Sequence, residues 1–308
     1  MLYIIVVILG MLVPIQTAAN ARMRMQVQSV WVVTLLSFSV STLALLGACA
    51  AGGVPLLPMG EQLQAAPWWS WSGGLIALLS ITAYICLFRE LGTLQATILP
   101  IVGQLVFGLV IDHYGFFRAE QIELTPLRIL AAALLLGGTA LAVAQPRAQG
   151  KQAGAPRRAW RTLALQLLGI GTGCLLASMG AIYGALGRAL GSAVQAALFS
   201  FTSATAAILL CCTAAGVVGL VRRAFAEPLP WWKWLGGVIG AMAVFGNAWI
   251  IPQMGAGAFF MLLTIGQIVL SLCMEQQGWL GAAKRRITYT QLAGLGVMLA
   301  GVALLRLC

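Results

Sequence analysis

An aromatic motif that occurs twice decides how this chain folds: residues 67–74 read PWWSWSGG, and residues 230–237 read PWWKWLGG. A shift of 163 positions carries the first copy onto the second. The same shift aligns further landmarks without a gap, namely Gly103 with Gly266, Gln104 with Gln267, and Asp112 with Glu275. Matches between apolar residues arise easily by chance, whereas a shared PWWxWxGG does not, so we infer an internal duplication.

The composition around these motifs is that of a membrane protein. Apolar residues make up 61% of the 308 positions, and only 8% are charged, against about 25% in soluble proteins. Ten apolar runs are long enough to cross a bilayer as helices. They lie at about 2–21, 29–50, 71–89, 93–112, 127–145, 162–183, 192–221, 234–251, 255–274 and 289–307. The first run lacks the basic start of a signal peptide, so we expect it to remain as the first helix.

Each copy of the duplicated unit contains five of these runs, which is an odd number. The second unit would therefore enter the membrane from the opposite side, as in the inverted repeats of secondary transporters. We predict an all-α membrane protein of ten transmembrane helices in two inverted five-helix repeats. The repeats are expected at 1–145 and 162–308, joined by a polar, basic linker over 146–161.

The basic residues predict an orientation, because short cytoplasmic loops are enriched in Lys and Arg. Fourteen of the 18 Lys and Arg residues fall in the odd-numbered connections, and four fall on the other face. We therefore expect a bacterial inner membrane protein whose linker and odd-numbered loops are cytoplasmic, with both termini outside. The basic residues are spread over five loops without interleaved aromatic residues, which favours contact with membrane lipid and argues against a nucleic-acid partner.

Amides are the deepest polar groups of the predicted helices. Gln16 and Asn20 are four residues apart on one face of the first helix, and Gln104 and Gln267 are near the middle of helices four and nine. A buried amide needs a hydrogen-bond partner, which could be another helix or a bound substrate. We predict that these four residues line a central substrate site, with helix-to-helix hydrogen bonding as the alternative.

Ionisable residues lie only near the ends of the predicted spans. Asp112 closes helix four, and Glu275 closes helix nine at the equivalent position. They are predicted to gate or couple transport at the two mouths of the pathway, or else to pair with Arg residues of the loops.

Catalytic and cofactor motifs are missing from the sequence. His113 is the only histidine, and no GxSxG, HExxH or phosphate-binding loop is present. The seven cysteines form no CxxC pair. We therefore expect no enzyme activity, no cofactor and no metal site.

Four stretches of the first unit resemble the drug/metabolite transporter superfamily, and within it the YdcZ-type family of five-helix proteins, here as a tandem fusion. They are PIQTAANAR at 14–22, SF at 37–38, WSGG at 71–74 and LGTLQATILPIVGQLVFGLVIDHYGFF at 91–117. The resemblance implies a ten-helix inner-membrane transporter that works by alternating access, and it names no substrate.

The sequence departs from this resemblance in two places. Related small multidrug resistance proteins use a membrane-embedded Glu on the first helix for proton-coupled export of cations, and the first helix here has no carboxylate. In the second unit, Met179 and Tyr183 replace Gln16 and Asn20.

The resulting hypothesis is a secondary transporter of a small neutral or zwitterionic metabolite. A monomer is sufficient in principle, because the two repeats pair within one chain. The alternative is a non-transporting membrane subunit with a role in assembly or regulation.

Overall fold

The computed structural model describes residues 1–58, 60–143, 156–226, 231–281, 284 and 287–305. Within these ranges, the side chains at 63, 81–82, 84–86, 88–97 and 156–159 are outside the description. Most of the expected linker, residues 146–155, therefore lies outside the described residues.

The described part of the chain is almost entirely helical and contains no strand. Its α-helices are α1 (Leu2–Val27), α2 (Val30–Ala51), α3 (Gly60–Ala65), α4 (Gly73–Tyr114), α5 (Pro126–Val143), α6 (Pro156–Leu190), α7 (Ala193–Ala214), α8 (Val221–Ala226), α9 (Leu235–Met254), α10 (Ala256–Gln277) and α11 (Tyr289–Leu305). Short 3₁₀ turns include η1 (Trp68–Ser72), η2 (Phe116–Arg118), η4 (Trp231–Trp234) and η5 (Trp279–Gly281). Among the described residues, seven helices are long and apolar enough to cross a membrane, and shorter apolar helices cover Ile98–Tyr114 and Tyr289–Leu305.

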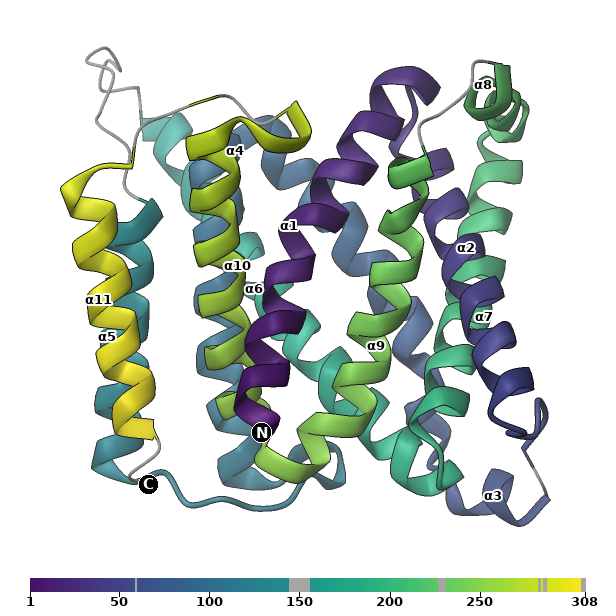
Figure 1. Cartoon of the computed structure of the whole chain (residues 1–308), viewed down its shortest axis with the longest axis horizontal. Coiled ribbons are helices and arrows are strands. Elements are labelled where there is room, and N and C mark those ends of the chain that lie inside the picture. Colours follow the sequence, from purple (N-terminus) through teal and green to yellow (C-terminus); the bar gives the residue numbers. More distant parts are fainter. Residues whose placement is uncertain (59, 144–155, 227–230, 282–283, 285–286, 306–308) are drawn as a thin grey trace.

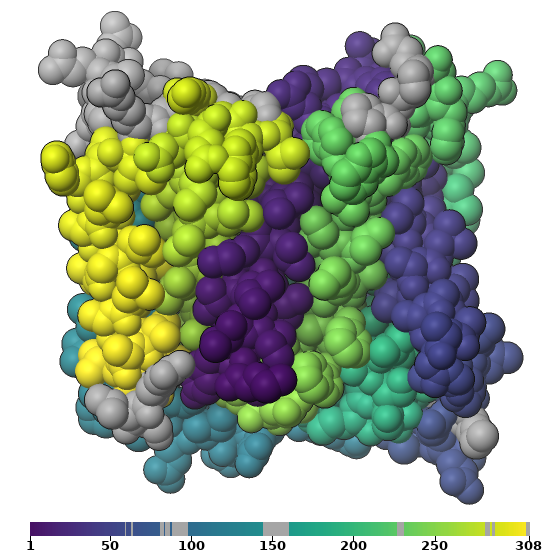
Figure 2. Space-filling model, in the orientation of Figure 1, coloured from purple at the N-terminus to yellow at the C-terminus, as the bar shows by residue number. Residues whose placement is uncertain are grey.

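The long helices stand upright in one bundle. In Figure 1, α5 and α11 pack together at one edge, α2 and α7 pack at the other, and the chain begins and ends at the same end of the bundle. Figure 2 shows α1 on the surface of this face, between α9 and α10. Ile4 and Ile8 of α1 are 63% and 51% exposed, as expected for side chains that face lipid.

Expected helices three and four, at 71–89 and 93–112, are not separate in the structure, because α4 runs through both. Gly73 lies against the ring of Tyr183, and thirty residues later Gly103 lies against the backbone at Cys174. A straight helix of that length would span about 45 Å, whereas the nine residues between these two contacts on α6 span about 14 Å. α4 therefore bends back on itself, and Figure 1 shows it rising and descending at the back of the bundle.

The second unit has a break at the corresponding place. α9 ends at Met254 and α10 begins at Ala256, with Gly255 between them at a φ of 84° and a ψ of 157°. This backbone conformation is open to glycine and strained for other residues.

Left-handed backbone conformations recur in pairs that are 163 positions apart. The pairs are Gln28 with Gly191, Gly53 with Gly216, Gly115 with Gly278, and Phe117 with Leu280. The helix caps repeat in the same way, since the hydroxyl of Ser29 accepts from the N–H of Val32 and that of Ser192 accepts from the N–H of Gln195. The two halves of the sequence therefore repeat the local backbone as well as the PWWxWxGG motif.

Helix contacts recur with the same spacing. Gly10 of α1 meets Gly266 of α10, and the equivalent residue of α6, Gly173, meets Gly103 of α4. A Cβ at any of these glycines would overlap backbone atoms of the partner helix, so glycine is needed for the helices to approach this closely. Helices one and four of the two halves thus pair crosswise.

Candidate functional site

The two amides of α1 face the first turns of α9. The Oδ1 atom of Asn20 lies against Gly236, and the Nε2 atom of Gln16 lies against Gly240 one turn further along. The two glycines are four residues apart on α9, as Gln16 and Asn20 are on α1, so each amide fits over a residue without a side chain. The expected pairing of Gln16 with Asn20 on one face is therefore what the structure shows.

Asn20 carries an unusual atom. Its Oδ1 is buried and accepts no hydrogen bond from any described residue. A buried acceptor without a donor costs about 1–3 kcal/mol. Sites of this kind in native proteins call for a specific explanation, and a ligand that donates a hydrogen bond is one.

One neighbouring hydroxyl already has acceptors. The hydroxyl of Ser41 lies near Gln16 and is 2.6 Å from the carbonyl oxygen of Gly237, to which it donates. Phe38 of α2 meets Phe201 of α7 edge to face, with ring centroids 5.3 Å apart. Phe201 and Ser41 both lie near Gly240, where Gln16 also lies, one helical turn from the contact of Asn20 with Gly236.

The equivalent region of the second unit has a different chemistry. Tyr183, which corresponds to Asn20, is 2% exposed and packs its ring on Gly73, the counterpart of Gly236. Its hydroxyl donates to the carbonyl oxygen of Gly73 at 3.3 Å. The hydroxyl of Tyr183 therefore has a partner within the chain, whereas the sequence indicated only that the amide is replaced here.

Gln104 and Gln267 are half-buried and directly follow the glycines that pair helices one and four. Neither amide forms a hydrogen bond with a described residue, and the two are not hydrogen-bonded to each other. The structure thus brings together only two of the four expected site residues, Gln16 and Asn20.

Asp112 holds the start of α10. Its side chain is fully buried, and its two oxygens accept the N–H groups of Ala256 at 2.7 Å and Gly257 at 2.9 Å. A carboxylate at a helix N-terminus satisfies free N–H groups and complements the helix dipole. Gly255 is required beside it, because a Cβ there would be 2.7 Å from the Asp112 carboxylate.

Glu275 has no such task in the structure. It is half-buried and makes no hydrogen bond or ion pair with a described residue. α4 is continuous where α9 and α10 are broken, so the first unit offers Glu275 no helix start to cap. The carboxylate that caps a helix could not be distinguished from its equivalent in the sequence, because both end an apolar run.

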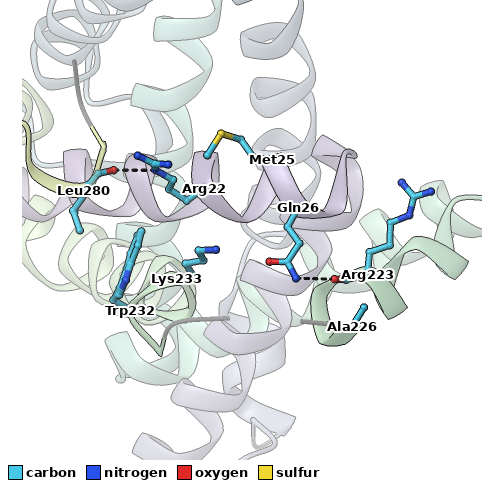
Figure 3. Close-up of a pocket in the computed structure, with 8 residues that line it drawn as sticks. All are labelled: Arg22, Met25, Gln26, Arg223, Ala226, Trp232, Lys233 and Leu280. Carbon is cyan, nitrogen blue, oxygen red and sulfur yellow. Dashed lines mark hydrogen bonds between the residues drawn. The ribbon is translucent and has the colours of Figure 1, made fainter. Parts of the chain in front are cut away.

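A pocket of about 680 Å³ opens at the end of the bundle where α1 ends (Figure 3). Its lining includes Arg22 and Gln26 of α1, Arg223 of α8, Trp232 and Lys233 of η4, and Leu280 of η5. In the sequence, these cations indicate only an orientation in the membrane. One signal in the sequence could have marked this pocket, because the duplication does not repeat its cations. The positions equivalent to Arg22, Arg223 and Lys233 are Ala185, Gly60 and Ser70, which carry no charge.

The opposite end of the bundle is closed by the counterparts of these residues. Trp69, equivalent to Trp232, meets Phe117, equivalent to Leu280, with ring centroids 5.6 Å apart. Arg188 donates from Nη2 to the carbonyl oxygen of Arg118 at 2.7 Å across the same end. Equivalent residues therefore line an open pocket at one end and a closed contact at the other.

Among the described residues, no group of three or more His, Cys, Asp or Glu side chains could hold a metal ion.

Comparisons with known proteins agree with this architecture. One family model, described as "Putative inner membrane exporter, YdcZ", matches residues 1–141 and again residues 164–304. A solved crystal structure is similar over 99% of this chain and 95% of its own chain, with a TM-score of 0.67 and 16% identity, which shows a shared fold. No curated protein matches the chain.

Proposed function

This chain belongs to the YdcZ family of inner-membrane exporters, and we propose from that premise that it is a secondary transporter that moves a small metabolite by alternating access. The family supports a multi-pass membrane transporter, which is a non-enzyme kind of protein. The mechanism, the site and the substrate class are inferred from the geometry.

The proposed architecture is ten crossings in two inverted five-helix repeats, 1–145 and 162–308. The fold-back of α4 supports two crossings within that element, and α1, α2, α5, α6, α7, α9, α10 and α11 supply one each. The paired backbone conformations and the crosswise glycine contacts, all 163 positions apart, support a two-fold relation between the units.

The two ends of the bundle support alternating access. Inverted repeats can exchange conformations, so that one end opens as the other closes. In this structure Trp232 and Leu280 line the open pocket, while Trp69 and Phe117 are in contact at the closed end. With the odd-numbered loops in the cytoplasm, the pocket opens inward and both termini lie outside.

The single observation that carries the site is the buried Oδ1 of Asn20, which has no donor among the described residues. We assign it to an N–H or O–H group of the substrate, with the Gln16 amide one turn away as the second contact. Gln104 and Gln267 extend the pathway along α4 and α10. Asp112 belongs to the closed mouth and Glu275 to the open one. Such a site suits a small polar metabolite that is neutral or zwitterionic.

Transport by variants tests this site. Liposomes that contain the protein are loaded with a mixture of metabolites. Mass spectrometry then identifies the metabolite that crosses the liposome membrane. Asn20→Leu removes the acceptor at similar volume and should lower that flux about tenfold or more, the equivalent of about 1.4 kcal/mol. Thr17→Val is the matched control on the exposed face of the same helix and should keep the wild-type flux. Unchanged flux in both Asn20→Leu and Gln16→Leu would overturn the site.

Cysteine labelling tests the orientation. In a variant without the native cysteines, Lys284→Cys lies in an odd-numbered connection and Glu61→Cys in an even-numbered one, both at exposed positions. An impermeant thiol reagent added to intact cells should label only Glu61→Cys. Labelling of Lys284→Cys alone would reverse the assignment.

A further inference from the structure

The open pocket concentrates positive charge that nothing in its described lining neutralises. Arg22, Arg223 and Lys233 reach it from the end of α1, from α8 and from η4, and no described lining residue is acidic. Figure 3 shows Arg22 and Lys233 on one side of the pocket and Arg223 on the other, with its guanidinium directed away from them. Arg22 is about 200 residues from the other two in sequence. A cleft lined by one sign of charge concentrates the opposite ion.

The hydrogen bonds of Arg22 and Arg223 leave most of their N–H donors without an acceptor among the described residues. Arg22 donates from Nε to the carbonyl oxygen of Leu280 at 3.3 Å, and Arg223 donates from Nη1 to the side-chain oxygen of Gln28 at 3.0 Å. Both acceptors are neutral, and a guanidinium has five N–H donors. The remaining donors have the planar geometry that carboxylate and phosphate groups match.

The positive charge of the pocket is present in only one of the two repeats. Trp232 has the aromatic counterpart Trp69 at the closed end, whereas the three cations correspond to Ala185, Gly60 and Ser70. An orientation signal requires basic residues on one face, but it does not require three of them to converge on one cavity. The cavity volume of about 680 Å³ also lies within the range of about 300–1,000 Å³ that is usual for small-molecule sites.

We propose that this pocket binds an anionic oxygen group, a carboxylate or a phosphate, and that the group belongs to the transported metabolite. This inference rests on the proposed function and narrows its substrate from a neutral or zwitterionic metabolite to a zwitterionic one. Arg22 is two residues from Asn20, and Lys233 is three residues from Gly236, so the pocket lies next to the proposed site along both chain segments. The cations would hold the anionic end of the metabolite while its N–H or O–H end reaches Asn20.

Citrate and inorganic phosphate are suitable probes, titrated against sodium chloride at equal ionic strength. A ligand that binds the folded protein raises its thermal midpoint. The wild-type protein in neutral detergent should show a saturable rise with either anion. The pocket variant Arg22→Gln, Arg223→Gln and Lys233→Gln should weaken this binding about tenfold or more, because charge-assisted hydrogen bonds are lost. The control variant is Arg24→Gln, Arg222→Gln and Lys284→Gln. It also removes two Arg and one Lys, but from exposed positions outside the pocket lining, and it should bind both anions as the wild type does.

Nanodiscs distinguish a metabolite from a lipid headgroup as the source of the anion. Protein in phosphatidylcholine should retain the citrate response, and phosphatidylglycerol should leave it intact. A pocket-dependent rise with phosphatidylglycerol that abolishes the citrate response would assign the pocket to lipid and overturn the proposal. The same midpoint rise in the pocket variant and in its control would overturn the anion site itself. Asn20→Leu should still bind citrate, so a failure of the transport proposal and a failure of the anion site give different results.

Discussion

Asn20 and Tyr183 occupy equivalent positions in the two halves, and each lies against a glycine of a neighbouring helix. One side chain is an amide and the other is a phenol. The Oδ1 atom of Asn20 lies against Gly236, is buried and has no donor among the described residues. Tyr183 covers Gly73 with its ring and donates its hydroxyl to the Gly73 carbonyl. The helices around them share the crosswise pairing of Gly10 with Gly266 and of Gly103 with Gly173. The framework is therefore common to both halves, while the unsatisfied polar group belongs to one.

This contrast separates residues that hold the fold from residues that are free to act. The glycines at the close helix contacts leave no room for a side chain, so both halves need glycine at these positions. A side chain at the interface between the halves can change if its own polar groups are satisfied. Tyr183 meets this condition, whereas the Oδ1 atom of Asn20 has no donor among the described residues.

The largest effect is expected at the shared framework. Gly173→Leu would place a side chain into the backbone of Pro100 and Gly103, so we expect a loss of about 3 kcal/mol in unfolding free energy. Gly171→Leu is the matched control, because a Cβ there meets nothing within 4 Å. Thermal unfolding in detergent measures both variants. Equal midpoints would mean that close approach at Gly173 does not hold α4 to α6.

The next effect compares the two carboxylates. Asp112→Ala leaves the N–H groups of Ala256 and Gly257 without their acceptors, and we expect a loss of about 2 kcal/mol. Glu275→Ala should change stability little, since Glu275 makes no hydrogen bond with a described residue. The difference between the two unfolding midpoints is the measurement. A larger loss in Glu275→Ala would contradict the capping role of Asp112.

A smaller effect of opposite sign is expected at the site itself. Asn20→Leu removes an unpartnered acceptor at similar volume, so the ligand-free protein should gain about 1 kcal/mol in stability while transport falls. Tyr183→Phe removes a satisfied hydrogen bond and should lose about 1 kcal/mol.

Opposite shifts of the thermal midpoint in Asn20→Leu and Tyr183→Phe would sharpen the contrast between the halves. If Asn20→Leu were destabilised as much as Tyr183→Phe, the Asn20 oxygen would have to be satisfied in the free protein.

The smallest effect concerns the place where the halves meet through identical residues. Thr42 and its equivalent Thr205 lie with their hydroxyl oxygens 3.1 Å apart between α2 and α7. Thr42→Val keeps the shape and removes this hydrogen bond, at a cost of about 0.6 kcal/mol, the average for hydrogen bonds between membrane helices. Thr213→Val is the control, because the Thr213 hydroxyl bonds within its own helix at an exposed position. If Thr213→Val lowers the thermal midpoint as much as Thr42→Val does, the loss comes from the hydrogen bond within the helix and not from the contact between α2 and α7.

Sequence reasoning succeeded where the signal is local or periodic. The apolar runs predicted a helical membrane protein, and the motifs of the first unit identified its family, which the match over 1–141 and 164–304 confirms. The expected separation of helices three and four was wrong as a description of secondary structure, because α4 is continuous from Gly73 to Tyr114. Hydropathy marks where a chain can cross a bilayer, but it does not report whether the backbone bonds continue through a bend.

The remaining features depend on which surfaces meet. Asp112 and Glu275 end equivalent runs, and only the break at Gly255 gives Asp112 a helix start to cap. Arg22, Arg223 and Lys233 are distant in sequence, so only the packing of α1, α8 and η4 places them around one pocket.

Composition, apolar run length and motif spacing are properties of the linear chain, so the amino-acid sequence was enough to predict the membrane class, the duplication and the family. Helix packing, in contrast, sets which half holds the buried Asn20 oxygen without a described donor, and at which end of the bundle the cationic pocket opens. Those properties are set by distances between side chains on different helices. The two halves share the glycines at which their helices pair, but they differ in these properties, because the side chains that meet across them are different.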